Sequence, residues 1–398
     1  PPAMARPSVA AGLVAALAMT RSLHAFQLTS VARQVQAPDF GVAAPEDVPG
    51  APSRQEAREA VRRMRAEPGS PQVLRQACGV LAQRGYADSN KDWMLSLGGI
   101  NASVEAMRRF PEDKGVQLAC AGAAGGQSLF NRGNMALAGE LGAVELVVAI
   151  MRRWPEDPTT QIGGVSGCFM DFSAVNRDRW ARAGGIELNI ASVRTHYSRP
   201  DVVVQAAYGF SSGTHSPNEQ RFADAGGIEL VVDLMRDHAK SVRVREECMQ
   251  ATRPLVELSD SLRAHVVEAG YIPWLVATMR DAPTDKHQLQ LACANLRELA
   301  GRNATHLAMA VKGGAAPLAL RAVREASGMG ADGTHQEYIE ASYTVREDCT
   351  ELLAVLAGDD QARQELLQAN ATQELTTLLQ QQPSNKRFQV KARELLHK

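Results

Sequence analysis

Six short glycine segments recur along the chain at a nearly constant spacing. They are Gly98-Gly99-Ile100, Gly142-Ala143-Val144, Gly184-Gly185-Ile186, Gly226-Gly227-Ile228, Gly270-Tyr271-Ile272 and Gly313-Gly314-Ala315. Their third residues lie 44, 42, 42, 44 and 43 positions apart. A fixed period in this range predicts stacked helical repeats. Such arrays mostly work by presenting an extended surface, so a catalytic site is not the default expectation.

The residues after each glycine segment predict an amphipathic helix. Apolar side chains recur at i, i+3, i+4 and i+7, as in Ile228, Val231, Val232 and Met235. A basic residue follows, where its positive charge suits the C-terminal end of a helix dipole. These basic residues are Arg108, Arg152, Arg194, Arg236 and Arg280.

Two further helices complete each unit. One opens with a pair such as Val116-Gln117, about nine residues later. The other is short and often starts at an asparagine, a favoured N-cap residue, as at Asn134, Asn176 and Asn303. The glycine segment should end this short helix, because the turn requires a positive φ. We therefore expect helices to end at residues 97–99, 141–143, 183–185, 225–227 and 269–271.

Three helices per unit of about 42 residues, with a Gly-Gly-Ile corner and a helix such as Val116-Gln117-Leu118-Ala119-Cys120, resemble the armadillo repeat. The resemblance covers residues 54–397. It implies an all-α fold, namely a right-handed superhelical solenoid of about seven three-helix repeats. The HEAT repeat has a similar period but normally lacks this glycine corner, so it ranks second.

Outside the repeats, the sequence suggests a leader and a linker. Residues 1–36 contain no Asp or Glu, have an 11-residue apolar run at Val9–Met19, and are expected to be a targeting presequence. The following Phe26-Gln27-Leu28-Thr29-Ser30 resembles two-part plastid leaders of algae with secondary plastids. A mitochondrial leader and a cytoplasmic chain without import are the alternatives. Residues 37–53 are a Pro-rich linker, and 327–341 are a loop insertion in the sixth unit.

Five of the six cysteines occupy one phase of the repeat. They are Cys78, Cys120, Cys248, Cys293 and Cys349. Packed helices lie about 8–10 Å apart, whereas a disulfide needs Cα atoms within about 7 Å. We therefore expect these cysteines to be buried and unpaired.

Composition and motifs weigh against several classes of function. The net charge is −1 and aromatic residues make up 5% of the chain, which disfavours nucleic-acid binding. No P-loop, dinucleotide fingerprint or Gly-x-Ser-x-Gly motif is present, and the histidines lack metal-ligand spacing. The run at Val9–Met19 is too short to span a bilayer. We expect no enzyme activity, cofactor, metal, small-molecule substrate or transmembrane span.

The resemblance implies that the third helix of each repeat lines a concave groove. Residues at the Gln position, four later and eight later would form one outward stripe. The candidate groove residues are Arg75, Gln117, Gln161, Phe169, Gln205, Arg245, Met249, Arg253, Gln290 and Glu298. The stripes lack the Trp–Asn ladder of nuclear-import receptors, so that type is not expected. Small residues in the middle of the stripes indicate either a shallow channel or tight helix packing.

These features favour a non-enzymatic scaffold that binds an extended segment or a helix of another protein through its concave surface. If so, the ligand should carry acidic residues opposite Arg245 and Arg253. The alternative is an accessory subunit that docks laterally in a larger assembly, such as an organellar one.

Overall fold

The computed structural model describes residues 50–87, 91–129, 131–166, 173–213, 217–282, 284–328, 336–381 and 386–396. Every regular element in these ranges is a helix, which confirms the all-α prediction. The chain divides into two compact units that meet between Arg221 and Phe222, within α13 (Glu219–Asp224). Residues 1–49, which hold the predicted presequence and most of the predicted linker, lie outside the described ranges.

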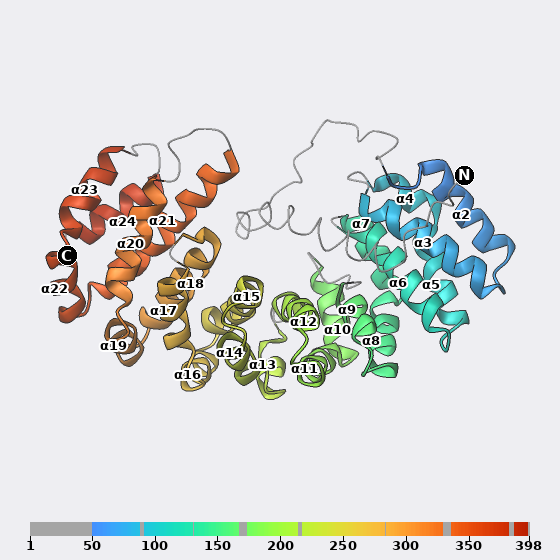
Figure 1. The fold of residues 1–398 in the computed structure, drawn as a ribbon, viewed down its shortest axis with the longest axis horizontal. Helices are drawn as coiled ribbons and strands as arrows, with labels where there is room; N and C mark the ends of the chain where they lie inside the picture. Colours follow the sequence, from blue (N-terminus) through green and yellow to red (C-terminus); the bar gives the residue numbers. More distant parts are fainter. Residues whose placement is uncertain are drawn as a thin grey trace, which may run out of the picture. The chain divides into compact units, whose positions relative to one another are not determined.

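Unit 1 runs up to residue 221, and its helices pack against their neighbours along the chain (Figure 1). It contains α2 (Arg54–Ala66), α3 (Pro71–Ala87), α4 (Asp92–Leu97), α5 (Gly99–Arg109), α6 (Lys114–Ser128), α7 (Arg132–Glu140), α8 (Ala143–Arg153), α9 (Pro158–Ser166), α10 (Ala174–Arg182), α11 (Gly185–Thr195) and α12 (Pro200–Gly213).

Unit 2 runs from residue 222, and its helices from α14 to α22 form three groups, each of a helix, a longer helix and a shorter one. It contains α14 (Gly227–Asp237), α15 (Val242–Leu258), α16 (Asp260–Glu268), α17 (Tyr271–Asp281), α18 (Lys286–Ala300), α19 (Ala304–Lys312), α20 (Ala315–Gly328), α21 (Gln336–Leu356), α22 (Asp360–Gln368), α23 (Ala371–Gln381) and α24 (Lys386–Leu396). The predicted insertion at 327–341 is narrower than expected, because residues 336–341 already belong to α21.

The glycine corners form as expected. One glycine of each segment has a φ between 74° and 94°, a region that side-chain-bearing residues rarely adopt. These glycines are Gly98, Gly142, Gly184, Gly226, Gly270 and Gly314. The short helices before the first five end at Leu97, Glu140, Arg182, Asp224 and Glu268, within one residue of the expected positions.

The basic residue before each loop has a role that spans two repeats. Arg65 donates to the carbonyl of Leu97 (3.2 Å), Arg108 to that of Leu141 and Arg152 to that of Ala183 (2.7 Å). Each acceptor directly precedes the next corner glycine, at the C-terminal end of a short helix. The arginine charge therefore interacts with the dipole of the following repeat's helix as well as that of its own.

Among Asn134, Asn176 and Asn303, the N-cap prediction is correct at one position and wrong at two. Asn303 caps α19 by accepting from Thr305 N (2.8 Å). Asn134 and Asn176 instead lie inside their helices and are buried. Asn134 Nδ2 donates to the carbonyls of Lys91 (3.1 Å) and Gln127 (2.7 Å), so it ties α7 to neighbouring segments rather than capping it.

The expectation that the cysteines are unpaired is wrong for four of them. Cys78 of α3 is bonded to Cys120 of α6, with Cα atoms 4.9 Å apart, and Cys293 of α18 to Cys349 of α21, at 5.0 Å. Cys248 is buried and forms no disulfide, as expected.

Small residues explain why α3 and α6 approach closely enough for this bond. A Cβ on Gly85 would lie 2.6 Å from the backbone of Gly126 and Gln127, and one on Gly126 would lie 3.0 Å from Ala82 O. The two backbones are therefore in direct contact, closer than an average helix pair. The sequence left open whether the small residues form a shallow channel or allow tight helix packing. In α6 they allow tight packing against α3.

Candidate protein-binding surfaces

The glutamines that were expected to line a groove are internal clamps. Gln117 is 3% exposed, and its Nε2 donates to the carbonyls of Met107 (2.6 Å) and Phe110 (2.8 Å) at the end of α5. Gln161 makes the equivalent bonds to Met151 and Trp154, both at 3.0 Å. The expectation that these two side chains point outward is therefore wrong, because they satisfy helix-end carbonyls that lack intrahelical partners.

Three more candidates are also buried. Gln205 is 9% exposed, Arg245 is 8% exposed and Met249 is fully buried. Because Arg245 is buried, the outward placement predicted for this residue is wrong. The stripe predicted from the sequence therefore lies on a buried face of these helices. A shift of one residue along a helix rotates the face by about 100°, so a small error in position selects the wrong face.

The outward side chains of unit 1 lie one residue beyond the predicted glutamines, or one before in α12. Leu118 of α6, Ile162 of α9 and Val204 of α12 are each half-buried, and the residue directly before each of them is buried. Tyr208 follows Val204 by one helical turn and is also half-buried. We name Leu118, Ile162, Val204 and Tyr208 the outward stripe. The helices α6, α9 and α12 that carry it contact one another in sequence.

The remaining candidates are mostly engaged in contacts within the protein. Arg75 Nη1 donates to both carboxylate oxygens of Asp113 (3.0 and 3.2 Å), the N-cap of α6. Arg253 Nε donates to Glu257 (2.6 Å), and Gln290 is half-buried. Glu298 accepts from Arg297 (2.9 Å) and Arg302 (3.2 Å). Phe169 lies outside the described residues.

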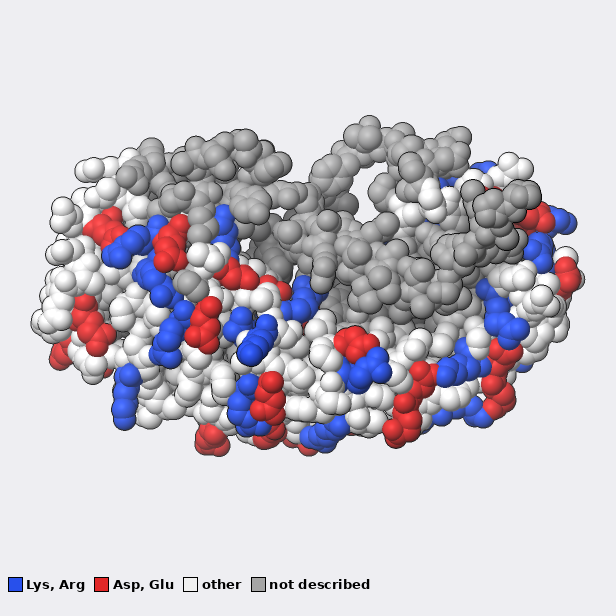
Figure 2. Space-filling model, viewed as in Figure 1, with Lys and Arg blue, Asp and Glu red and all other residues white. Residues whose placement is uncertain are grey.

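Surface charges are paired from one repeat to the next. Glu145 of α8 accepts from Arg179 of α10 (3.0 Å), and Glu187 of α11 is paired with Arg221 of α13. In unit 2, Glu229 of α14 lies against His265 of α16. Figure 2 accordingly shows blue and red side chains next to one another over much of the face in view. Among the described side chains in that view, the two signs of charge are therefore interspersed.

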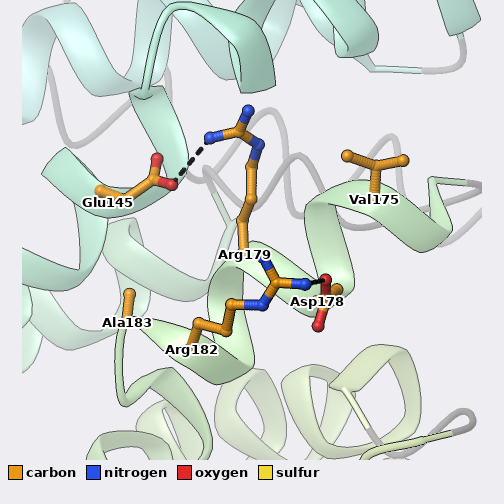
Figure 3. Close-up of a pocket in the computed structure, with 6 residues that line it drawn as sticks. All are labelled: Glu145, Val175, Asp178, Arg179, Arg182 and Ala183. Carbon is orange, nitrogen blue, oxygen red and sulfur yellow. Dashed lines mark hydrogen bonds and ion pairs between the residues drawn. The ribbon is translucent and has the colours of Figure 1, made fainter.

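One surface cleft of unit 1 is internally neutralised. It has a volume of about 470 Å³ and lies between α8 and α10 (Figure 3). Its two arginines are both paired, Arg179 with Glu145 of α8 and Arg182 with Asp178 of its own helix. Only Val175, which is 66% exposed, offers the cleft an apolar side chain that is largely open to solvent. A charged ligand would have to replace existing ion pairs here.

A second cleft of unit 1 has a different character. It has a volume of about 460 Å³ and lies between the C-terminal turns of α5 and α8. Arg108, Arg152, Arg153 and Trp154 line it together with Leu146 and Ala149 of α8. We name it the Arg–Trp cleft. A cationic rim over an apolar floor is suited to a ligand that is both acidic and apolar.

Two further features concern the described ranges, namely metal-binding clusters and membrane-spanning helices. Nowhere in those ranges do three or more His, Cys, Asp or Glu side chains lie where they could hold a metal ion. Within the same residues, no helix alone has the length and apolarity needed to cross a membrane. Only the pair α7 and α8, bent by 66° at its break, meets that test when the two are combined.

Comparisons with known proteins bear on the fold alone. No protein-family model matches the chain, and no curated protein matches it. A crystal structure of an engineered protein from the Northeast Structural Genomics Consortium is similar, with a TM-score of 0.65 and 18% sequence identity. The match covers 85% of this chain and 87% of the engineered one. At this level of identity the chain shares an overall helical fold with that protein, and the likeness extends no further.

Proposed function

We propose that the chain is a non-enzymatic protein-binding scaffold built as an armadillo-type solenoid. The recurring positive-φ glycine corners, the interlocking corner arginines and the likeness to the engineered protein support the architecture. The observation that carries the binding function is the outward stripe. It repeats an apolar, half-buried side chain at the equivalent position of three successive repeats, while nearby surface charges are paired.

The spacing of the outward stripe favours a helical partner. Packed helices lie about 8–10 Å apart, so Leu118, Ile162 and Val204 should be separated by similar steps. Residues i and i+7 on a helix are about 10.5 Å apart along its axis, on the same face. An amphipathic helix of another protein could therefore place one apolar side chain against each repeat.

A selection experiment tests this proposal. A displayed library of helical peptides would be selected on the wild-type protein and tested on the variant Ile162→Glu/Val204→Glu. We expect the variant to bind the selected peptides at least about tenfold more weakly, because charges would be buried at the contact. A matched control, Asn101→Glu/Ala191→Glu, changes two exposed positions on α5 and α11 and should change the dissociation constant less than about twofold. If the selected peptides bind the stripe variant as tightly as they bind the control variant, the outward stripe is not their binding surface.

Lateral docking is the second candidate, and one observation favours it. Four apolar side chains are much more exposed than the outward stripe, namely Val175 (66%), Leu258 (63%), Leu367 (54%) and Val390 (54%). Single exposed apolar residues are common, so they carry less weight than a repeated position. If charge substitutions at these residues abolish partner binding while the stripe variant does not, the accessory-subunit function is the better account.

The disulfides bear on where this scaffold would work. Structural disulfides persist in oxidising environments and are rare in the cytosol. The bonds Cys78–Cys120 and Cys293–Cys349 therefore support passage through an oxidising compartment, and they weigh against the cytoplasmic alternative. Mass spectrometry of a non-reduced digest of native protein would test both linkages directly.

A further inference from the structure

A seven-residue motif occurs twice in unit 1, and its two copies flank the Arg–Trp cleft. Met107–Asp113 reads MRRFPED and Met151–Asp157 reads MRRWPED. Each copy covers the last turn of a helix, α5 or α8, and the loop that follows it. The first copy contributes Arg108 to the cleft, and the second contributes Arg152, Arg153 and Trp154.

The cleft carries positive charge that the protein does not neutralise. Arg108 and Arg152 donate to the carbonyls of Leu141 and Ala183, which are uncharged acceptors. Neither arginine forms an ion pair with a carboxylate of the described residues, and both are exposed. Arg153 is paired with Glu112 of the first copy. The contrast with the cleft of Figure 3 is clear, because both arginines there are paired.

The apolar part of the cleft is held in place by backbone contacts. Trp154 N donates to Ile150 O (3.2 Å), and Trp154 O accepts from the buried Gln161 (3.0 Å). The guanidinium carbon of Arg153 lies 5.8 Å from the centre of the Trp154 ring, within cation–π distance. On α8, Ala149 is exposed and Leu146 is half-buried, so a small apolar floor is open to solvent.

We propose that the Arg–Trp cleft binds an acidic segment of a protein partner. A carboxylate of the segment interacts with Arg108 and Arg152, and a neighbouring apolar side chain packs against Leu146 and Ala149. Arginine suits this role because its planar guanidinium binds carboxylates through two hydrogen bonds. The inference rests on the proposed scaffold function, but it assigns a second surface with a different chemistry from the outward stripe.

The test uses two synthetic peptides and fluorescence anisotropy. The acidic probe is fluorescein-labelled Asp-Asp-Leu-Leu-Asp-Asp, and the reference probe has asparagine in place of each aspartate. We expect the wild-type protein to bind the acidic probe at least about tenfold more tightly, with the difference shrinking at high salt. Equal binding of the two probes, or no binding of either, would overturn the proposal. So would equally effective competition by inorganic phosphate alone, since a simple anion site needs no apolar floor.

Three variants locate the binding. Arg108→Gln/Arg152→Gln removes the two unpaired charges and should reduce binding of the acidic probe to the level of the reference probe. Arg109→Gln removes a neighbouring charge that lies outside the cleft and is paired with Glu105, and it should change affinity less than about twofold. Ala149→Phe fills the floor without altering charge and should also weaken binding. An equal loss in Arg109→Gln would show non-specific charge attraction and contradict the cleft assignment.

The stripe variant Ile162→Glu/Val204→Glu separates this inference from the function on which it rests. It should still bind the acidic probe, because neither residue lines the Arg–Trp cleft. If selected helical peptides bind through the outward stripe while the acidic probe fails on wild-type protein, only the cleft proposal is refuted. If the selection yields no stripe-dependent peptide, the scaffold function fails, whatever the acidic probe does.

Discussion

The two units build the same glycine corner but secure it with different side-chain contacts. In unit 1, Arg65, Arg108 and Arg152 each reach the carbonyl before the next corner glycine. In unit 2, Arg280 reaches Gly313 O at 3.4 Å, whereas Arg236 is paired with Asp233 and Asp237 of its own helix, at 2.7 Å each. The corner backbone therefore does not depend on the arginine.

Two carboxylates on the same helix account for the different contact made by Arg236. Arg65, Arg108 and Arg152 are followed by Ala66, Arg109 and Arg153, which offer no carboxylate. Arg236 and Arg280 are followed by Asp237 and Asp281, and in the first case the neighbouring acid takes the guanidinium. Arg280 still reaches the next corner, and it lacks the second carboxylate that Asp233 gives Arg236 one turn earlier. Two carboxylates on one helix thus hold Arg236 on its own helix, because a local ion pair needs less ordering of the chain.

The two units are alike, in contrast, in that each contains one disulfide between buried cysteines. Of the changes predicted here, removal of a disulfide should lower the free energy of unfolding most. Cys78→Ala/Cys120→Ala and Cys293→Ala/Cys349→Ala open loops with sequence separations of 42 and 56. We expect each pair to lower the free energy of unfolding by about 4 kcal/mol, since loop closure varies little over this range. Urea denaturation followed by circular dichroism measures both. A difference above about 2 kcal/mol would contradict equivalent roles.

Thiol counting is the control for this first comparison. In denaturant without reductant, no more than two of the six cysteines should react, because four are in disulfides. In native protein Cys248 should react slowly. Burial, and secondarily the charge of Glu247, raises the pKa of the Cys248 thiol, which keeps it in the less reactive protonated form. Six reactive thiols in denaturant would show that neither disulfide forms.

A second comparison concerns the stability contributed by a glutamine that donates to helix-end carbonyls in each unit. Gln117→Leu leaves the carbonyls of Met107 and Phe110 without their donor inside unit 1 and should cost about 2 kcal/mol of stability. Gln389 of unit 2 donates to Leu379 O (2.6 Å) but is half-buried, so water can replace it in Gln389→Leu. We expect a cost of about 1 kcal/mol there. Equal costs in urea denaturation would mean that burial does not set the value of the clamp.

Substitution of a corner glycine should destabilise unit 1 slightly more than unit 2. A Cβ on Gly184 would lie 3.1 Å from Arg152 Nη2, whereas a Cβ on Gly270 would have no neighbour within 4 Å. Both positions have positive φ, so alanine is strained at each by about 1 kcal/mol. Gly184→Ala should cost about 0.5 kcal/mol more, because it also displaces the arginine. Gly270→Asn is the control and should recover part of the loss, since asparagine tolerates this conformation. Thermal denaturation of the three variants decides the order.

Corner arginines should give the smallest effects. Arg152→Met keeps the apolar stem but loses the contact with the next helix end, at a cost of about 0.5–1 kcal/mol that falls with added salt. Arg236→Met loses only exposed ion pairs within its own helix and should cost clearly less than Arg152→Met. Chemical denaturation at two salt concentrations compares them. A cost for Arg236→Met as large as that for Arg152→Met would remove the distinction between the two units.

The sequence alone determined those features that depend on local backbone chemistry. The glycine period located the corners to within one residue because a positive φ is a property of single residues. Amphipathic spacing and the N-cap at Asn303 also depend only on neighbouring residues. The helical content and the helix ends near the corners could therefore be predicted from the sequence. The signal for the Arg–Trp cleft was also present, as two copies of one seven-residue motif, but a motif does not reveal which of its charges are neutralised.

Only the tertiary structure decided which side chains face outward and which atoms meet. Predicted groove residues such as Gln117 and Arg245 are buried, since a shift of one residue rotates a helix face by about 100° and helix-end carbonyls recruit the glutamine amide. The Cys78–Cys120 disulfide forms because Ala82, Gly85 and Gly126 let two backbones touch, an approach that an average helix spacing excludes. Distances of this kind depend on the packing of residues about 40 positions apart, which no local pattern specifies.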